Sequence, residues 1–249
     1  MKKHLSLFML FVKQRIYKEL LVLAGLAAVN YAGFKLFGET DTIGFARGTA
    51  GYVYAFAFMA AYFALMFICV PMSQKRSNSL YTLQRLSISE RWVFIWECLA
   101  SALCFLLLMA AEILILLCLA GIFEKMPGFN QGPQGILIAL FDSEFFYGLI
   151  PLGMPDCWVR NGVFVFCCGV LCAYTAMDVR HGKKKTVGTL FCIFLVLGLW
   201  LPISPRDTVS VAFHMCVSLL LSIGCFFWAM VTAHGGKGGE YIEDEYEEN

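Results

Sequence analysis

Four polar side chains stand inside long apolar stretches of the sequence, where few other groups could do chemistry. They are Asn30, Glu97, Glu112 and His214. If these stretches cross a membrane, burying such groups is costly, so they mark ion pairs, proton relays or substrate paths. We expect a structural ion pair, and the functional alternative is a polar patch on a substrate path. The pairings that helical depth allows are Glu112 with His214, and either of these with Arg160 or Arg206.

Familiar catalytic motifs are missing from the sequence at these depths. There is no GxSG serine motif, no pair of glutamates followed by arginine, and no HExxH, DxxD or CxxC within the apolar stretches. A P-loop GxxxxGK[ST] is also missing, which excludes ATP hydrolysis by that route. We therefore predict no catalytic residue, no cofactor and no enzyme activity in this chain.

Ten of the eleven cysteines fall within the apolar stretches, and Cys157 lies near one end of them. A free cysteine among apolar groups behaves as a small apolar residue. Cys167, Cys168 and Cys172 lack the CxxC spacing of a metal clip. We predict neither a metal site nor a structural disulfide.

The elements that carry these residues are six continuous apolar runs. They cover residues 20–37, 52–72, 92–123, 159–177, 186–203 and 209–232. A helix needs roughly 20 mainly apolar residues to cross a bilayer core. The runs are continuous rather than alternating, so they do not have the pattern of barrel strands. We predict an all-α polytopic membrane protein with a six-span domain over 20–232, whose overlong third span tilts or extends into the cytosol.

Lysine and arginine divide unevenly between the two sides of such a bundle. With the N-terminus inside, 14 of the 19 basic residues lie on the cytoplasmic side, as the positive-inside rule requires. Both termini are then cytoplasmic. The formal net charge is only +1 and no soluble basic domain is present, so we expect no nucleic-acid partner.

The two ends of the chain are polar. Residues 1–19 put five apolar side chains on one helical arc, namely Leu5, Phe8, Met9, Val12 and Ile16. We predict an amphipathic helix in the membrane interface, with Lys13, Arg15 and Lys18 toward anionic lipid headgroups. The alternative is that this segment is the cytoplasmic end of the first span. Residues 233–249 are rich in glycine and then acidic, which is typical of a disordered cytoplasmic tail.

Residues 124–158 form the largest external segment, and four prolines interrupt it. Its apolar part, 136–150, contains Asp142 and Glu144. A central carboxylate costs about 2.5 to 3.5 kcal/mol on insertion scales. We therefore expect an interfacial or re-entrant helix here rather than a seventh span.

A polar and basic segment joins the second and third spans and reads MSQKRSNSLYTLQRLSISERW over residues 72–92. Ser77 or Asn78 can cap a short helix over 77–87. Leu80, Leu83 and Leu86 would then share an arc of about 120°. An apolar strip at the cytoplasmic surface needs either lipid headgroups or a protein groove to cover it.

This segment and the six-span topology resemble the membrane subunit of type-2 ATP-binding-cassette exporters. In many such subunits the loop follows a pattern near E-R-R-S-G-T-L-x-x-L-L-x-x-P-[VI]-S-R. The residues in matching places, without a gap, are Gln74, Lys75, Arg76, Ser77, Asn78, Ser79, Leu80, Leu83, Ser87, Ile88 and Ser89. The sequence departs from the pattern where Gln74 replaces an acidic residue, Asn78 a glycine and Ser87 a proline, and where Trp96 and Glu97 replace a Gly-Lys pair.

The resemblance implies a permease subunit in a bacterial plasma membrane, with 77–87 as the coupling helix for a separate cytoplasmic ATPase. The residues expected to contact that ATPase are Ser77, Asn78, Leu80, Tyr81, Leu83, Gln84, Arg85 and Leu86. Two ATPase copies would bind ATP and Mg, and a second permease, identical or different, would complete the translocation path. Spans with 23 Phe in the chain and few charges favour an amphipathic or hydrophobic peptide, bacteriocin or drug as cargo.

Two other functions stay open at this point. An ion-gradient-driven secondary transporter would show inverted repeats and broken helices near the midplane, and no repeat is evident in the sequence. A structural or immunity-type membrane protein would have no transport cycle. A neighbouring gene for a lone ATPase would favour the exporter over both.

Overall fold

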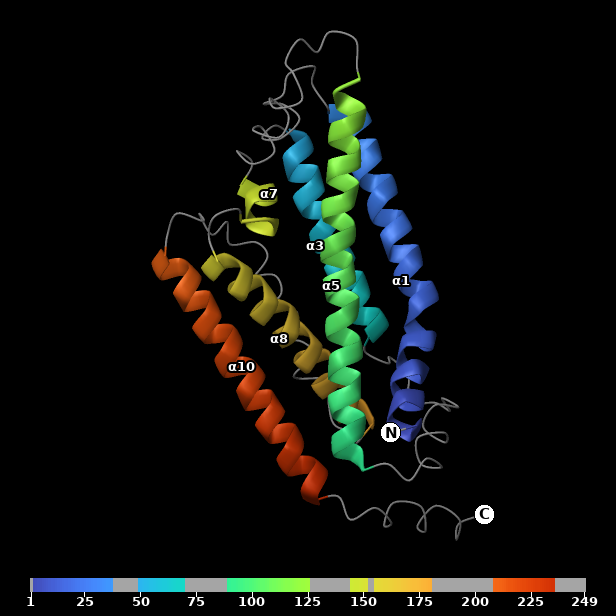
Figure 1. Ribbon diagram of the computed structural model, residues 1–249, viewed down its shortest axis with the longest axis vertical. Coiled ribbons are helices and arrows are strands. Elements are labelled where there is room, and N and C mark those ends of the chain that lie inside the picture. The colour runs from blue at the N-terminus through green and yellow to red at the C-terminus, as the bar shows by residue number, and fades with distance from the viewer. Residues whose placement is uncertain are drawn as a thin grey trace, which may run out of the picture.

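The computed structural model describes residues 2–37, 49–69, 89–125, 144–151, 155–180 and 208–235. These residues form helices without any strand, which confirms the all-α prediction for this part of the chain. The helices are α1 (Lys2–Phe37), α3 (Thr49–Cys69), α5 (Glu90–Phe123), α7 (Glu144–Leu149), α8 (Pro155–Arg180) and α10 (Thr208–Gly235). Figure 1 shows the long helices side by side in one bundle, with the short α7 above α8.

Four of the described helices are long and apolar enough to cross a membrane. They are His4–Leu36, Gly51–Cys69, Glu90–Phe123 and Pro155–Val179, and α10 adds a shorter apolar stretch, Met215–Val231. The expected runs 20–37, 92–123 and 159–177 lie inside α1, α5 and α8, and 52–72 overlaps α3. The expected run 186–203 lies outside the described residues.

The distribution of polarity in the bundle is that of a membrane protein. The outward faces of α1, α5 and α10 are covered by large apolar side chains such as Leu21, Leu114 and Phe227, which are 74%, 62% and 68% exposed. Arg15, Glu19, Asn30, Glu97, Ser101 and Glu112 are buried inside. A water-soluble bundle would present the opposite pattern, so these helices are built for lipid contact.

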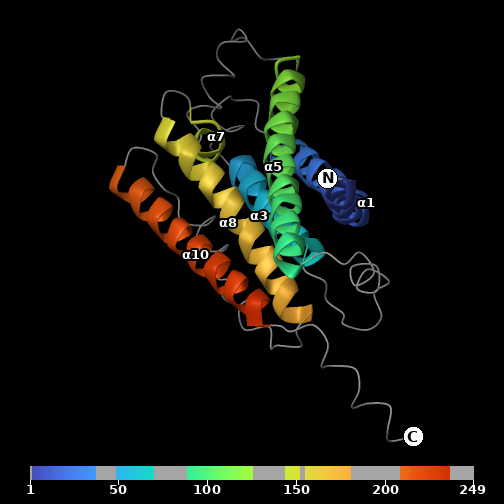
Figure 2. The ribbon, with the colours of Figure 1, turned by 60° about the horizontal axis from the view of Figure 1, so that its bottom comes forward.

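Side-chain contacts give the relative directions of the long helices. Contacts pair His4 with Trp92 and Phe34 with Phe123, so α1 and α5 run parallel. Arg15 reaches Cys69 at the end of α3, which therefore runs antiparallel to both. Figures 1 and 2 show α8 and α10 side by side and parallel, each ending near the start of α5.

The most enclosed helix is α8, because every side chain from Cys167 to Val179 is buried. Its small residues allow a close crossing with α5. A Cβ added to Gly169 would lie 2.8 Å from the carbonyl oxygen of Cys98 and 2.9 Å from the backbone nitrogen of Ala102. Small residues at crossings are a general device for packing membrane helices, and this one fixes α8 against the first half of α5.

The amino-terminal segment differs from what its pattern predicts. Residues 2–19 do not form a separate helix, because α1 continues from Lys2 to Phe37. On the predicted apolar arc, Leu5 and Met9 are 59% and 58% exposed. The buried stripe is Leu7, Phe11, Arg15 and Glu19, one residue every four.

The prediction that Arg15 faces lipid headgroups is therefore wrong. This side chain points into the bundle because it has polar partners there, whereas Lys13 and Lys18 are exposed. The placement of this helical end at a membrane interface stays a prediction.

Several predicted features fall on residues that are not described. They include the coupling helix over 77–87, the acidic tail and most of the external segment 124–158. Within that segment the structure describes α7, and α8 begins at Pro155, four residues before the expected start of the fourth span.

Candidate functional site

Two polar centres lie along the contact between α1 and α5. Arg15 and Glu97 form the first, and Asn30 and Glu112 form the second. On each helix the two centres are fifteen residues apart, which is about 22 Å along the axis. Because α1 and α5 run parallel, equal spacing on both helices puts both pairs in register.

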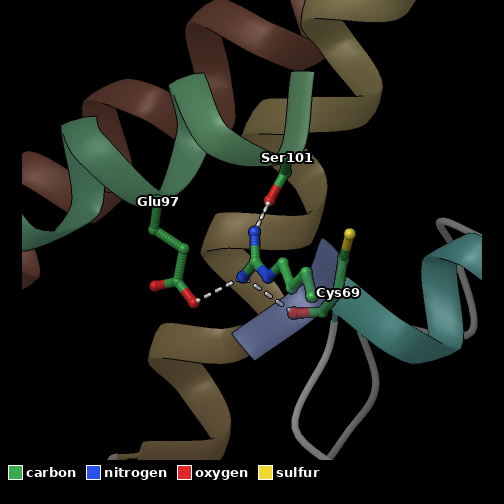
Figure 3. A network of polar contacts seen from close by, with 4 residues as sticks. Cys69, Glu97 and Ser101 are labelled. Carbon is green, nitrogen blue, oxygen red and sulfur yellow. Dashed lines mark hydrogen bonds and ion pairs between the residues drawn. The ribbon is translucent and has the colours of Figure 1, made fainter. Parts of the chain in front are cut away.

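The first centre is an arginine held by three groups from two other helices. The Nη1 atom of Arg15 donates to the Oγ of Ser101 at 2.8 Å. Its Nη2 atom donates to the carbonyl oxygen of Cys69 at 3.1 Å and to the Oε1 of Glu97 at 3.2 Å. Figure 3 shows Cys69, Glu97 and Ser101 converging on the guanidinium from α3 and α5.

These contacts give the buried guanidinium group a counter-ion and hydrogen-bond acceptors. Arg15 and Glu97 are only 7% and 4% exposed at their side chains, so the ion pair is shielded from water. The carbonyl oxygen of Cys69, the last described residue of α3, accepts from the same Nη2 atom that contacts Glu97. Arg15 therefore neutralises Glu97 while it holds this end of α3.

This arrangement ties together the two helices that flank residues 70–88. Cys69 is the last residue of α3, and Glu97 lies two turns into α5. The Arg15 clamp, by which we mean Arg15 with Cys69, Glu97 and Ser101, therefore fixes both ends of that connection to α1.

Thiols and a second carboxyl group surround the clamp. The Cys69 thiol interacts with those of Cys104 on α5 and Cys172 on α8, and Cys104 also interacts with Glu19 on α1. All ten described cysteines have free thiols. Among the described residues, no group of three or more histidine, cysteine or acidic side chains could hold a metal ion. We assign these thiols to packing among four helices.

The second centre is a carboxyl group paired with an amide. The Nδ2 atom of Asn30 donates to both oxygens of Glu112, at 3.0 Å and 2.8 Å. Both residues are fully buried. Apolar side chains lie one turn away on either side, among them Leu26 and Phe34 on α1 and Leu108 and Leu116 on α5.

Three of the four polar candidates thus divide between the two centres. Glu97 belongs to the first, and Asn30 and Glu112 form the second. The side chain of His214 and all of Arg206 lie outside the described residues, so the pairings predicted for them stay predictions. Arg160 is not the partner of Glu112, because its hydrogen bonds go to Asn161 and to the carbonyl oxygen of Gly148.

Arg15, Glu19 and Ser101 were not among the sequence candidates. A signal for them does exist in the sequence. Arg15 and Asn30 have the same fifteen-residue spacing as Glu97 and Glu112, which is the pattern that two parallel helices with matched polar contacts would carry. Arg15 and Glu19 also continue a four-residue repeat that begins at Leu7.

Comparison with protein-family models, curated proteins and solved structures gave no match.

Proposed function

We propose that the chain is the permease subunit of an ATP-driven exporter of the type-2 ATP-binding-cassette class. In this role six spans form half of a translocation path, and a second permease supplies the other half. The segment 77–87 docks on a cytoplasmic ATPase that binds ATP and Mg. The cargo would be an amphipathic or hydrophobic peptide, bacteriocin or drug.

The position of the Arg15 clamp is the observation that most strongly supports this proposal. A coupling helix is useful only if its displacement reaches the spans. Segment 70–88 is joined to α3 at Cys69 and to α5 near Glu90, and the clamp binds both of these helices to α1. A push on the segment would therefore act on three spans together.

The directions of the helices also support six spans. Parallel neighbours such as α8 and α10 need one return crossing between them, and the apolar run 186–203 is long enough to supply it. An even number of spans would leave both termini on one side, as the distribution of basic residues predicts.

The experiment is to co-express the chain with a candidate ATPase from the same genome and to measure ATP hydrolysis by the purified complex. We expect Leu83→Asp to reduce co-purification and the stimulation of hydrolysis, because it places a charge on the leucine strip. Thr82→Asp adds the same charge off the strip and serves as the matched control. If no ATPase co-purifies with the wild-type chain, or if both variants behave like it, the proposal fails.

The second candidate is an ion-gradient-driven secondary transporter, and the pair Asn30–Glu112 favours it. Buried carboxyl groups in membrane spans often mark ion paths. This candidate predicts cargo transport that a proton gradient drives in vesicles containing the chain alone. The exporter predicts that such vesicles transport nothing until the ATPase and ATP are added.

A further inference from the structure

The second polar centre holds a carboxyl group for which the described residues provide no cation. On α1, Arg15 is about 22 Å away along the helix, and Lys35 is exposed with its ammonium group 5.9 Å from the ring of Tyr31. The sequence of α3 contains no Lys, Arg or His. On α5 the basic residue is Arg91, and Lys125 lies just beyond its end; each is more than ten residues from Glu112.

The described groups around Glu112 are neutral. Asn30 donates from its amide nitrogen, and Tyr54 of α3 is within electrostatic range of the carboxyl group. Arg160 on α8 is engaged with Asn161 and Gly148. An ionised carboxylate at this position would stand in lipid-facing helices without a counter-ion among the described residues, which burial strongly disfavours.

A second observation concerns the amide oxygen of Asn30. The Oδ1 atom of Asn30 is fully buried and accepts no hydrogen bond. A carboxylate has no hydrogen to offer it, whereas a carboxylic acid has one O–H donor. A primary amide beside a carboxylic acid can form two reciprocal hydrogen bonds, from the amide N–H to the acid carbonyl and from the acid O–H to the amide oxygen.

We propose that Glu112 and Asn30 form a proton-binding site inside the membrane-spanning bundle. The bound proton lies on a carboxyl oxygen of Glu112, and the resulting O–H group donates a hydrogen bond to the Oδ1 of Asn30. A small rotation of the amide from its position between the two carboxyl oxygens completes the ring of two hydrogen bonds. The pair then carries no net charge, and every polar atom in it has a partner.

The site links the proton to the contact between α1 and α5. When the two helices separate and water enters, Glu112 becomes an ordinary carboxyl group, which is ionised at neutral pH because its pKa in water is about 4.3. Opening this contact therefore releases a proton, and closing it takes one up. This linkage holds for either candidate function, since it depends on the separation of α1 from α5 and not on what drives it.

The test uses the full chain purified and reconstituted in lipid. Infrared spectroscopy at neutral pH separates a protonated carboxyl group, whose C=O stretch lies at higher frequency, from a carboxylate. We expect a protonated-acid band that disappears in Glu112→Gln and persists in Glu124→Gln, which changes an exposed glutamate just beyond the end of α5. A spectrum that Glu112→Gln leaves unchanged would overturn the proposal.

A second measurement needs no variant and guards against a misfolded one. Dicyclohexylcarbodiimide adds to protonated carboxylic acids in apolar surroundings and leaves an acylurea that mass spectrometry locates. In the wild-type chain we expect the adduct on Glu112 and not on Glu124. Absence of the adduct from Glu112, with the protein folded, would show that the carboxyl group is ionised.

Discussion

Removal of the Arg15 side chain should destabilise the bundle far more than removal of an exposed lysine on the same helix. Arg15→Met keeps the length of the side chain but deletes hydrogen bonds to Ser101, Cys69 and Glu97. Hydrogen bonds between membrane helices average about 0.6 kcal/mol, so three of them set a lower bound near 2 kcal/mol. Breaking a buried ion pair costs about 3 to 5 kcal/mol, because the other charge is left unpaired. We expect a loss of about 3 kcal/mol in the free energy of unfolding.

The assay is unfolding of the purified chain in mixed micelles by increasing amounts of a denaturing detergent. Lys13→Met is the matched control, because Lys13 lies two residues away and is exposed. The double variant Arg15→Met/Glu97→Met should cost less than the sum of the two single variants, since the second change removes the charge that the first leaves unpaired. If Arg15→Met costs no more than Lys13→Met, or if the two single effects add, the clamp does not stabilise the bundle.

Two further substitutions test the packing and the second centre. Gly169→Val should prevent the close crossing of α8 and α5, because the new side chain meets backbone atoms of Cys98 and Ala102. A Cβ added to Gly162 of the same helix meets nothing within 4 Å, so Gly162→Val is the control. Detergent unfolding should show a large loss of stability for Gly169→Val alone. Equal losses for the two variants would contradict the close crossing. Asn30→Leu should cost only about 1 to 2 kcal/mol in the same assay, since it removes hydrogen bonds to a neutral acid. A loss as large as that of Arg15→Met would indicate an ionised Glu112 instead.

The sequence predicts the apolar helices well because their signal is local. The run 92–123 lies within α5 (Glu90–Phe123), where a long and mainly apolar sequence begins three residues after Ser89 at the N-cap. The carbonyl of Ser89 accepts hydrogen bonds from the backbone nitrogens of Trp92 and Val93, so the helix begins where the polar segment ends. Composition alone is enough to predict such an element.

The orientation of Arg15 could not be predicted in the same way. Its partners Glu97 and Ser101 are 82 and 86 residues away in the sequence. An arginine flanked by Lys13 and Lys18 has the composition of a headgroup contact, and only tertiary packing separates it from its neighbours. The same holds for Asn30 and Glu112, which were recognised as polar residues in apolar runs but could not be paired without knowing that α1 and α5 run parallel.

If the leucine strip of segment 77–87 docks on an ATPase, site-specific photo-cross-linking in native membranes should capture the contact. A photoreactive residue placed at position 83 or 86 should form an adduct with the candidate ATPase. The same residue at position 82, off the strip, should give little adduct. We expect adducts with that ATPase at 83 and 86; their absence from both positions, in a chain that is expressed and inserted, would show that the strip does not dock on it.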